Sequence, residues 1–146
     1  MEFDKSETQK VPSNAIEEAK SSLRMNNFHF SSIELSYDGT KIERQEACIT
    51  AMHEISNQNA DRITLTIEII GGPGSFSLSV SAQATFTIDG ESDISQNILI
   101  KRNAISIMFP YLRSEVTLLT SQPGMVPIVL PPLNINNLMD KAEISP

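Results

Sequence analysis

One stretch in the second half of the chain, residues 105–138, constrains the fold more than any other. Its first half has apolar residues at helical spacing with Pro110 in the middle. Its second half is a proline-rich segment of large aliphatic residues that is almost free of charge. A loop of this length is uncommon in a compact domain unless it acts as a lid or a binding loop. Because its apolar side chains must be buried or offered to a partner, the segment predicts a binding surface or an interface.

The composition narrows the classes of function. A chain of 146 residues with 40% apolar residues fits a single domain with one core. A net charge of −7, from 11 basic and 18 acidic residues, argues against nucleic-acid binding, which needs clustered Lys and Arg. The sequence contains no run of about 18 apolar residues, so no membrane span is predicted. The polar, charged start of the chain does not resemble a secretory signal peptide, which favours the cytoplasm.

The N-terminal region divides into a tail and the start of a domain. We expect residues 1–12 to be a flexible tail and residues 13–146 to form the domain. Asn14 lies three residues before Glu17, a spacing that resembles a capping box. Apolar residues then recur at helical spacing, which predicts a short helix over about residues 15–25.

Four later segments alternate apolar and polar residues, as half-buried strands do. Two phenylalanines and the apolar residues that follow them lie on opposite parity, which predicts a bulge near Ser31–Ser32. Short turns, including a glycine-rich hairpin loop at residues 71–74, favour one twisted antiparallel sheet. The non-core face of the last strand is uncharged Ser and Thr, so it could meet solvent, another subunit or a groove. The expected strands cover residues 28–37, 47–55, 63–69 and 76–88.

A long helix is expected from about Ile94 to Ser121. Its main apolar stripe holds Ile105, Phe109, Leu112, Val116 and Leu119. Four further apolar residues lie off this stripe: Ile100, Ile107, Tyr111 and Leu118. A helix that is apolar on more than one side is usually buried on more than one side. Because a single sheet covers one side, a neighbouring subunit is expected on the other.

Several prolines and a glycine in the second half of the chain are expected to determine where its helix bends and ends. Pro110 cannot donate a hydrogen bond to the carbonyl of Ser106, so we expect a kink or a restart there. Pro123 and Gly124 are expected to end the helix. Later prolines keep the loop extended, and a short last helix is predicted from about Ile135 to Ala142.

The residues that could perform catalysis are few and badly placed. Cys48 and His53 lie five residues apart on a predicted strand, so they fall on opposite faces and cannot form a nucleophile–base pair. With His29 they make a poor zinc site, and a single cysteine cannot form an internal disulfide. The glycine cluster at 71–74 lacks the following Lys and Ser or Thr of a phosphate-binding loop. The acidic turn at 89–93 lacks the closing Glu of a calcium loop. We therefore expect no enzyme, no metal and no cofactor.

The helix and the loop after it resemble those of the SecB protein-export chaperones. The residues that carry the resemblance are IMFPY at 107–111, Arg113, PIVLPPLN at 127–134 and Leu138. The segment from Ile63 to Gly90 is similar to the two central strands of that family. The resemblance covers roughly residues 24–140, and the FPY segment followed by the proline-containing loop is its most specific part.

The resemblance implies an α+β fold and a chaperone function. The expected fold is a four-stranded antiparallel sheet packed by a long helix in the C-terminal half, with a proline-rich lid loop and a short last helix. The family forms homotetramers, as dimers of dimers, and binds unfolded polypeptides, including preproteins, in hydrophobic grooves. It delivers preproteins to the SecA motor of the translocase and uses neither ATP nor a cofactor.

The sequence suggests which side chains bind a client and which join copies of the chain. The expected peptide-binding groove and lid consist of Phe86, Met125, Val126, Val129, Leu130 and Leu133, and the alternative is that these residues fill the core. The expected oligomer interface on the helix consists of Ile107, Tyr111 and Leu118. Methionines suit a surface that adapts to many partners.

The chain departs from the family at two places that matter for its partners. Ser79 stands where the family carries an acidic residue for the motor, and the family's acidic C-terminal tail is reduced to residues 141–146. A SecB-like chaperone with another client, such as an antitoxin, is therefore an alternative to export. A second alternative is an oligomeric adaptor without chaperone activity. A third is a small-molecule enzyme or binding protein, against which the missing polar constellation counts.

Overall fold

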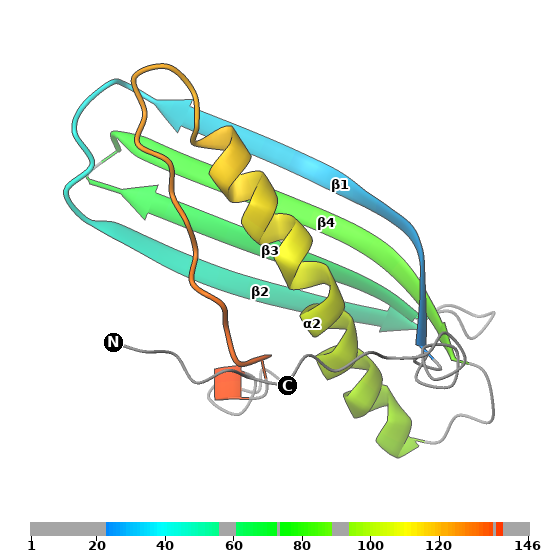
Figure 1. Ribbon diagram of the computed structural model, residues 1–146. Helices are drawn as coiled ribbons and strands as arrows, with labels where there is room; N and C mark the ends of the chain where they lie inside the picture. The colour runs from blue at the N-terminus through cyan, green and yellow to red at the C-terminus, as the bar shows by residue number, and fades with distance from the viewer. Residues whose placement is uncertain (1–22, 56–60, 73, 89–93, 136, 139–146) are drawn as a thin grey trace, which may run out of the picture.

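The computed structural model describes residues 23–55, 61–72, 74–88, 94–135 and 137–138 (Figure 1). A four-stranded antiparallel sheet lies in one layer, and one long helix crosses one face of it diagonally. This confirms the expected α+β architecture. The predicted tail and residues 15–22 of the first predicted helix lie outside the described residues.

The sheet is built from β1 (Leu23–Tyr37), β2 (Gln45–Ile55), β3 (Asp61–Gly71) and β4 (Phe76–Ile88). Their order is β1-β4-β3-β2, so β1 and β2 are the two edges. Hairpins join β2 to β3 and β3 to β4, whereas the chain crosses from one edge to the other between β1 and β2. All three pairings are antiparallel.

The start of β1 corrects one prediction. Residues Leu23 to Met25, expected at the end of a helix, are strand. Leu23 pairs with Ile88 and Met25 with Phe86, so both lie on the same face of the sheet as the β4 core residues. Pairing with a central strand outweighs the weak local preference for helix.

The predicted bulge in β1 is confirmed, and a second one precedes it. The register with β4 shifts between Phe30 and Ser32 and again between Asn26 and His29. Asn27 has φ of 55°, in the left-handed region that Asn tolerates better than most residues. The two irregularities together bring the apolar residues on both sides of them onto the helix side of the sheet.

The core lies between the sheet and the helix α2 (Ile94–Leu119). Every second residue of β3 and β4 points into it, as the alternation predicted. The predicted helical stripe is buried as well, except that Leu119 is half-buried. The largest buried side chains are Phe76, Phe86, Ile63, Leu65, Ile67, Ile69, Leu78, Ile105, Met108, Leu112, Val80 and Val116.

The helix α2 runs through Pro110 as one element, so the expected restart is absent. Pro110 and Ser106 are both exposed, so water can satisfy the carbonyl that lacks a donor. The helix ends at Leu119, and a turn follows in which the Met125 N–H donates to the Gln122 carbonyl at 3.0 Å. Gly124 has φ of 81°, as the third residue of a type II turn requires.

The chain after this turn stays extended and then begins another helical turn. Asn134 caps it: its side-chain oxygen accepts a hydrogen bond from the Asn137 N–H at 3.1 Å. The Leu138 N–H donates to the Asn134 carbonyl at 3.0 Å. The predicted last helix therefore begins near Ile135, and residues 139–142 of it lie outside the described residues.

Candidate functional site: apolar surfaces beside the long helix

The apolar loop runs back along α2 and is attached to it by two threonines. The Ile128 N–H donates to Thr120 Oγ1 at 2.8 Å, and Thr117 Oγ1 donates to the Ile128 carbonyl at 2.8 Å. Thr120 Oγ1 also donates to the Val116 carbonyl at 2.7 Å, so this buried hydroxyl is both a donor and an acceptor of hydrogen bonds. Ile128 is consequently buried, and the loop is held at a defined distance from the helix.

The attachment decides which loop side chains face outward. Val126 is 82% exposed and Val129 is 69% exposed, on the two sides of the buried Ile128. We call these two residues the loop surface. Three other predicted groove residues are partly buried and pack against the core: Met125, Leu130 and Leu133. The sixth, Phe86, is fully buried inside the core and has no surface to offer a client in this conformation.

Replacing Thr120 with valine tests the attachment. The shape is nearly kept, but the Ile128 N–H loses its acceptor inside the protein. A buried donor left without a partner costs about 1–3 kcal/mol, so we expect that loss in the free energy of unfolding, measured with urea. The Ser121→Ala variant is the matched control, because that exposed hydroxyl bonds one carbonyl of the same helix end. Equal losses in the two variants would mean that the attachment contributes nothing.

A second apolar surface lies on the other flank of α2. The predicted interface residues Ile107, Tyr111 and Leu118 share one side of the helix, and we call them the helix surface. Tyr111 is 51% exposed and Leu118 is 63% exposed, whereas Ile107 is half-buried. The loop passes on the β2–β3 side of α2, and β1 lies on the opposite side (Figure 1).

The edge strand β1 extends the helix surface. The rings of Tyr111 and Phe28 are 4.9 Å apart, which ties the helix flank to that strand. Beyond this contact, Ile33 is 42% exposed and Leu35 is 38% exposed, although both pair with core residues of β4. Their register puts these two on the same face of the sheet as the core residues of β4.

The residues considered for catalysis stay apart. Cys48 pairs with Glu68 and His53 with Ile63, which puts the two side chains on opposite faces of the sheet, as predicted. The His53 ring is engaged elsewhere, with Nε2 2.7 Å from Asp61 Oδ1. Among the described residues, no three His, Cys, Asp or Glu side chains come together as metal ligands would. No helix in the described part of the chain is long and apolar enough to cross a membrane.

No family model matches the chain. An uncharacterized protein of Methanocaldococcus jannaschii is 29% identical over 66 residues, which is 45% of this chain. The match covers 43% of that protein, so the chain spans less than half the length of the curated relative it matches.

Comparison with solved structures is more informative. The SecB-like chaperone of Mycobacterium tuberculosis, solved in complex with a ChAD peptide from the HigA1 antitoxin, matches with a TM-score of 0.64 at 13% identity. The match covers 77% of this chain and 88% of that chain. The chain has the SecB-like fold. A protein of unknown function from Streptococcus agalactiae matches with a TM-score of 0.38 at 11% identity, over 77% and 100% of the chains, which is too low to support a conclusion.

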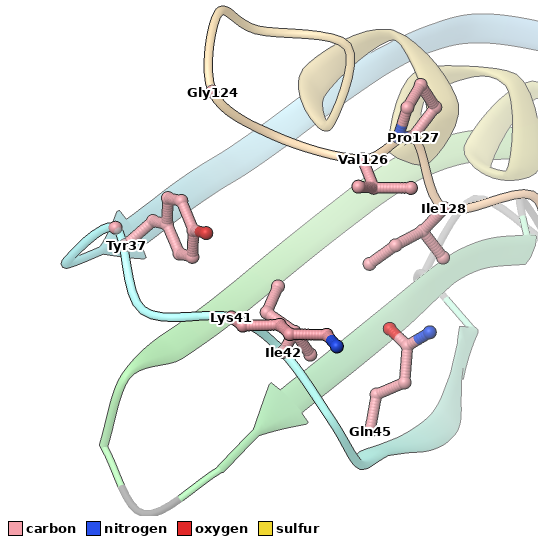
Figure 2. A pocket seen from close by; sticks show the side chains of 9 residues that line it. Tyr37, Lys41, Ile42, Gln45, Gly124, Val126, Pro127 and Ile128 are labelled. Carbon is pink, nitrogen blue, oxygen red and sulfur yellow. The ribbon is translucent and has the colours of Figure 1, made fainter.

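The SecB-like fold of this chain carries a cavity of about 400 Å³ at one end of the sheet. It lies between the loop at Gly124–Ile128 and the connection from β1 to β2 (Figure 2). Tyr37, Ile42 and Val126 supply apolar walls. Lys41 and Gln45 supply the polar groups. Sequence reasoning found the loop side of this cavity but missed the β1–β2 connection, because nothing local in that connection signals a binding site.

The face of the sheet away from α2 carries Ser79, where the SecB family is acidic. Ser79 pairs with Glu34 on β1 and with Glu68 on β3. Because side chains directly opposite one another across neighbouring strands lie on the same face, this row holds two carboxylates beside the serine. This row of the SecB-like sheet is therefore still negatively charged, although it carries a serine.

Proposed function

We propose that the protein is an ATP-independent chaperone, a holdase, that binds non-native polypeptides through the loop surface. The observation that carries the proposal is the exposure of Val126 and Val129 on a loop that is attached to α2 through the buried Ile128 between them. A folded monomer gains nothing from holding two valines in water, whereas a chaperone needs apolar surface that does not collapse into its own core. The SecB-like fold supports the same function.

The client is the open part of this proposal. The structural neighbour was solved with a peptide from an antitoxin, which supports a dedicated client of that kind at least as well as preproteins destined for export. The carboxylates of Glu34 and Glu68 beside Ser79 keep the SecA motor as a candidate partner in the export alternative. Either role places the protein in the cytoplasm.

The test is suppression of aggregation. Insulin reduced with dithiothreitol is mixed with equimolar protein in the absence of nucleotide, and light scattering is followed. Binding the unfolded chain removes it from the aggregating pool by mass action, so we expect scattering to be suppressed. If the scattering of reduced insulin is the same with and without the well-folded protein, the proposal is contradicted. That result would favour an oligomeric adaptor without chaperone activity.

We also infer that the helix surface joins copies of this chain, as a tetramer or a dimer. Tyr111 and Leu118 form an exposed apolar stripe, and Tyr111 contacts Phe28 of β1, the strand that also exposes Ile33 and Leu35. An apolar patch of this kind on a helix beside an edge strand is typical of an interface. The loop surface lies on the other flank, so assembly would leave it free for a client.

Replacing Leu118 with aspartate tests the assembly. A charge at the centre of an apolar interface is expected to shift the mass measured by light scattering from that of an oligomer to that of one chain. The matched control is Ser106→Asp, which adds the same charge at an exposed position on another side of α2. A wild-type protein that is already a single chain, or an oligomer unaffected by Leu118→Asp, would show that the helix surface is not the interface.

A further inference from the structure

Arg113 is a half-buried cation on the flank of α2 that holds the loop. Thr117 follows it by one helical turn and Thr120 by two, so the three residues share one stripe of the helix. The two threonines bind Ile128, and the loop then runs back along α2 (Figure 1). An extended chain advances about 3.3 Å per residue and a helix about 1.5 Å, so two loop residues match roughly one helical turn. Leu130 therefore lies at about the level of Arg113.

The guanidinium of Arg113 forms no ion pair or hydrogen bond with another described residue. Glu115 is close in sequence, but side chains two residues apart on a helix do not face each other. Among the described residues, the helix side of β2 and β3 carries one carboxylate, that of Asp61, and His53 Nε2 lies 2.7 Å from it. The sequence from 116 to 138 contains no charged residue. Arg113 is therefore a single positive charge beside an uncharged loop.

The lack of an internal partner distinguishes Arg113 from a cation that stabilises the fold. Arg62, by comparison, is paired with Glu54 on the other face of the sheet. A charge that is partly withdrawn from water without a protein acceptor costs free energy. Any ligand that brings a carboxylate to Arg113 would recover that free energy, because the planar guanidinium can donate two parallel hydrogen bonds to a carboxylate.

The spacing of the apolar and charged groups favours a polypeptide over a small molecule. The exposed residues of the loop surface, Val126 and Val129, are three residues apart, which is about 10 Å along an extended chain. Arg113 lies beyond Val129, at the level of the next loop residue. An extended chain can contact these groups in succession, with apolar side chains on the valines and a carboxylate on the arginine. A small molecule is too short to do so.

We propose that the loop surface selects client segments in which an acidic residue, Asp or Glu, flanks apolar residues, and that Arg113 binds its side-chain carboxylate. This rests on the proposed chaperone function and names a feature of the client. With a net charge of −7, the protein as a whole repels acidic chains, so the preference must come from the local contact with Arg113.

Fluorescence anisotropy with short peptides tests the proposal. The probe is fluorescein-labelled Gly-Ser-Asp-Thr-Leu-Thr-Val-Thr-Asp-Ser-Gly with an amidated C-terminus, so its only carboxylates are the two Asp side chains beyond the label. One Asp on each side of the apolar residues makes the direction of binding unimportant. We expect the probe to bind about fivefold more tightly than the peptide with Asn at both positions, as one ion pair near the surface allows. The peptide with Lys at both positions should bind more weakly than the Asn peptide.

Arg113→Gln is the decisive variant. It should remove the preference for Asp over Asn, whereas Arg113→Lys keeps the charge and should keep a preference. The matched control is Arg62→Gln, which removes the same charge on the sheet face away from α2 and should leave the preference as in the wild type. In about 1 M salt the preference of the wild type should shrink, because charges are then screened within about 3 Å.

Three results would contradict the proposal. If the wild type binds the Asp and Asn peptides equally, no acidic residue is selected, whatever the variants do. If Arg62→Gln removes the preference as Arg113→Gln does, the overall charge of the protein and not the local contact explains it. If Arg113→Gln changes the oligomeric mass measured by light scattering, Arg113 contacts a second copy of the chain instead of a client.

These outcomes separate from those of the chaperone test. Suppression of insulin aggregation without any preference between the peptides overturns the role of Arg113 and leaves the holdase function standing. A clear peptide preference without suppression does the reverse. Absence of both peptide binding and suppression overturns both.

Discussion

Replacing Val126 and Val129 together with aspartate is expected to abolish client binding and leave the fold intact. The two side chains are 82% and 69% exposed, so they contribute little to the stability of the isolated chain. Burying a valine against a client is worth about 1.5–3 kcal/mol, so losing both should weaken binding by a factor of about 10²–10⁴. The measurements are insulin aggregation at equimolar protein and the free energy of unfolding in urea.

The matched control for this double variant is Gln122→Asp with Asn134→Asp. Both residues are exposed and polar, and they lie at the two ends of the same loop. The control adds the same two negative charges without removing apolar surface, and aspartate caps a helix as well as asparagine does. If the control loses suppression equally, charge and not apolar contact explains the effect. If the valine variant keeps suppression, the loop surface is not the client site.

Exposure also decides which residues are useful for such tests. Leu130 and Leu133 belong to the same predicted groove, but both pack partly against the core. An aspartate at either position would therefore lower stability and binding together, and the two effects could not be separated. Val126 and Val129 avoid this because their side chains are mostly in solvent.

Much of the fold could be predicted from the sequence because the strands have one covered face. Strict alternation from Phe76 to Phe86 leaves a single register in which every apolar residue enters the core. The bulge near Ser31–Ser32 followed from the same rule, because apolar residues on both sides of it had to reach one face. The helix bounds were close for a similar reason, since its stripe and its terminating Pro123–Gly124 are local signals.

The failures have a different physical cause. The helical spacing before Met25 was local and weak, whereas the pairing of Leu23 with Ile88 involves residues far apart in the sequence. Periodicity also says which face of an element is apolar, but not what covers that face. For this reason alternation placed Ile33 and Leu35 on one face of a strand without showing that they are exposed there, and Phe86 was assigned to the groove although it is covered.

The parts of the site that no sequence pattern indicated are those made by contacts across the fold. Thr117 and Thr120 are ordinary helix residues until Ile128 is placed beside them. Lys41 is one more surface charge until the loop at residues 124–128 closes a cavity next to it. Ser79 seemed to remove a negative charge until the register set it between Glu34 and Glu68. Each of these depends on long-range register, which the alternation permits but does not specify.

Replacing Phe86 with alanine should destabilise the protein without changing how the folded molecule binds a client. Phe86 is fully buried and pairs with Met25 on one side and with Asp61 on the other. Removing a buried phenylalanine side chain leaves a cavity and typically costs about 3–5 kcal/mol. That is a large part of a typical stability of about 5–15 kcal/mol, so the urea midpoint should fall steeply with an unchanged slope.

The control is Val129→Ala, which trims an exposed side chain and should change the free energy of unfolding by less than about 0.5 kcal/mol. Peptide affinity, measured well below the unfolding transition and corrected for the folded fraction, separates the two roles of Phe86. If Phe86 belongs only to the core, Phe86→Ala keeps the wild-type affinity, whereas Val129→Ala lowers it. The opposite pattern, with stability kept and affinity lost in Phe86→Ala, would mean that the core opens at this residue to admit the client, and that Phe86 lines the groove after all.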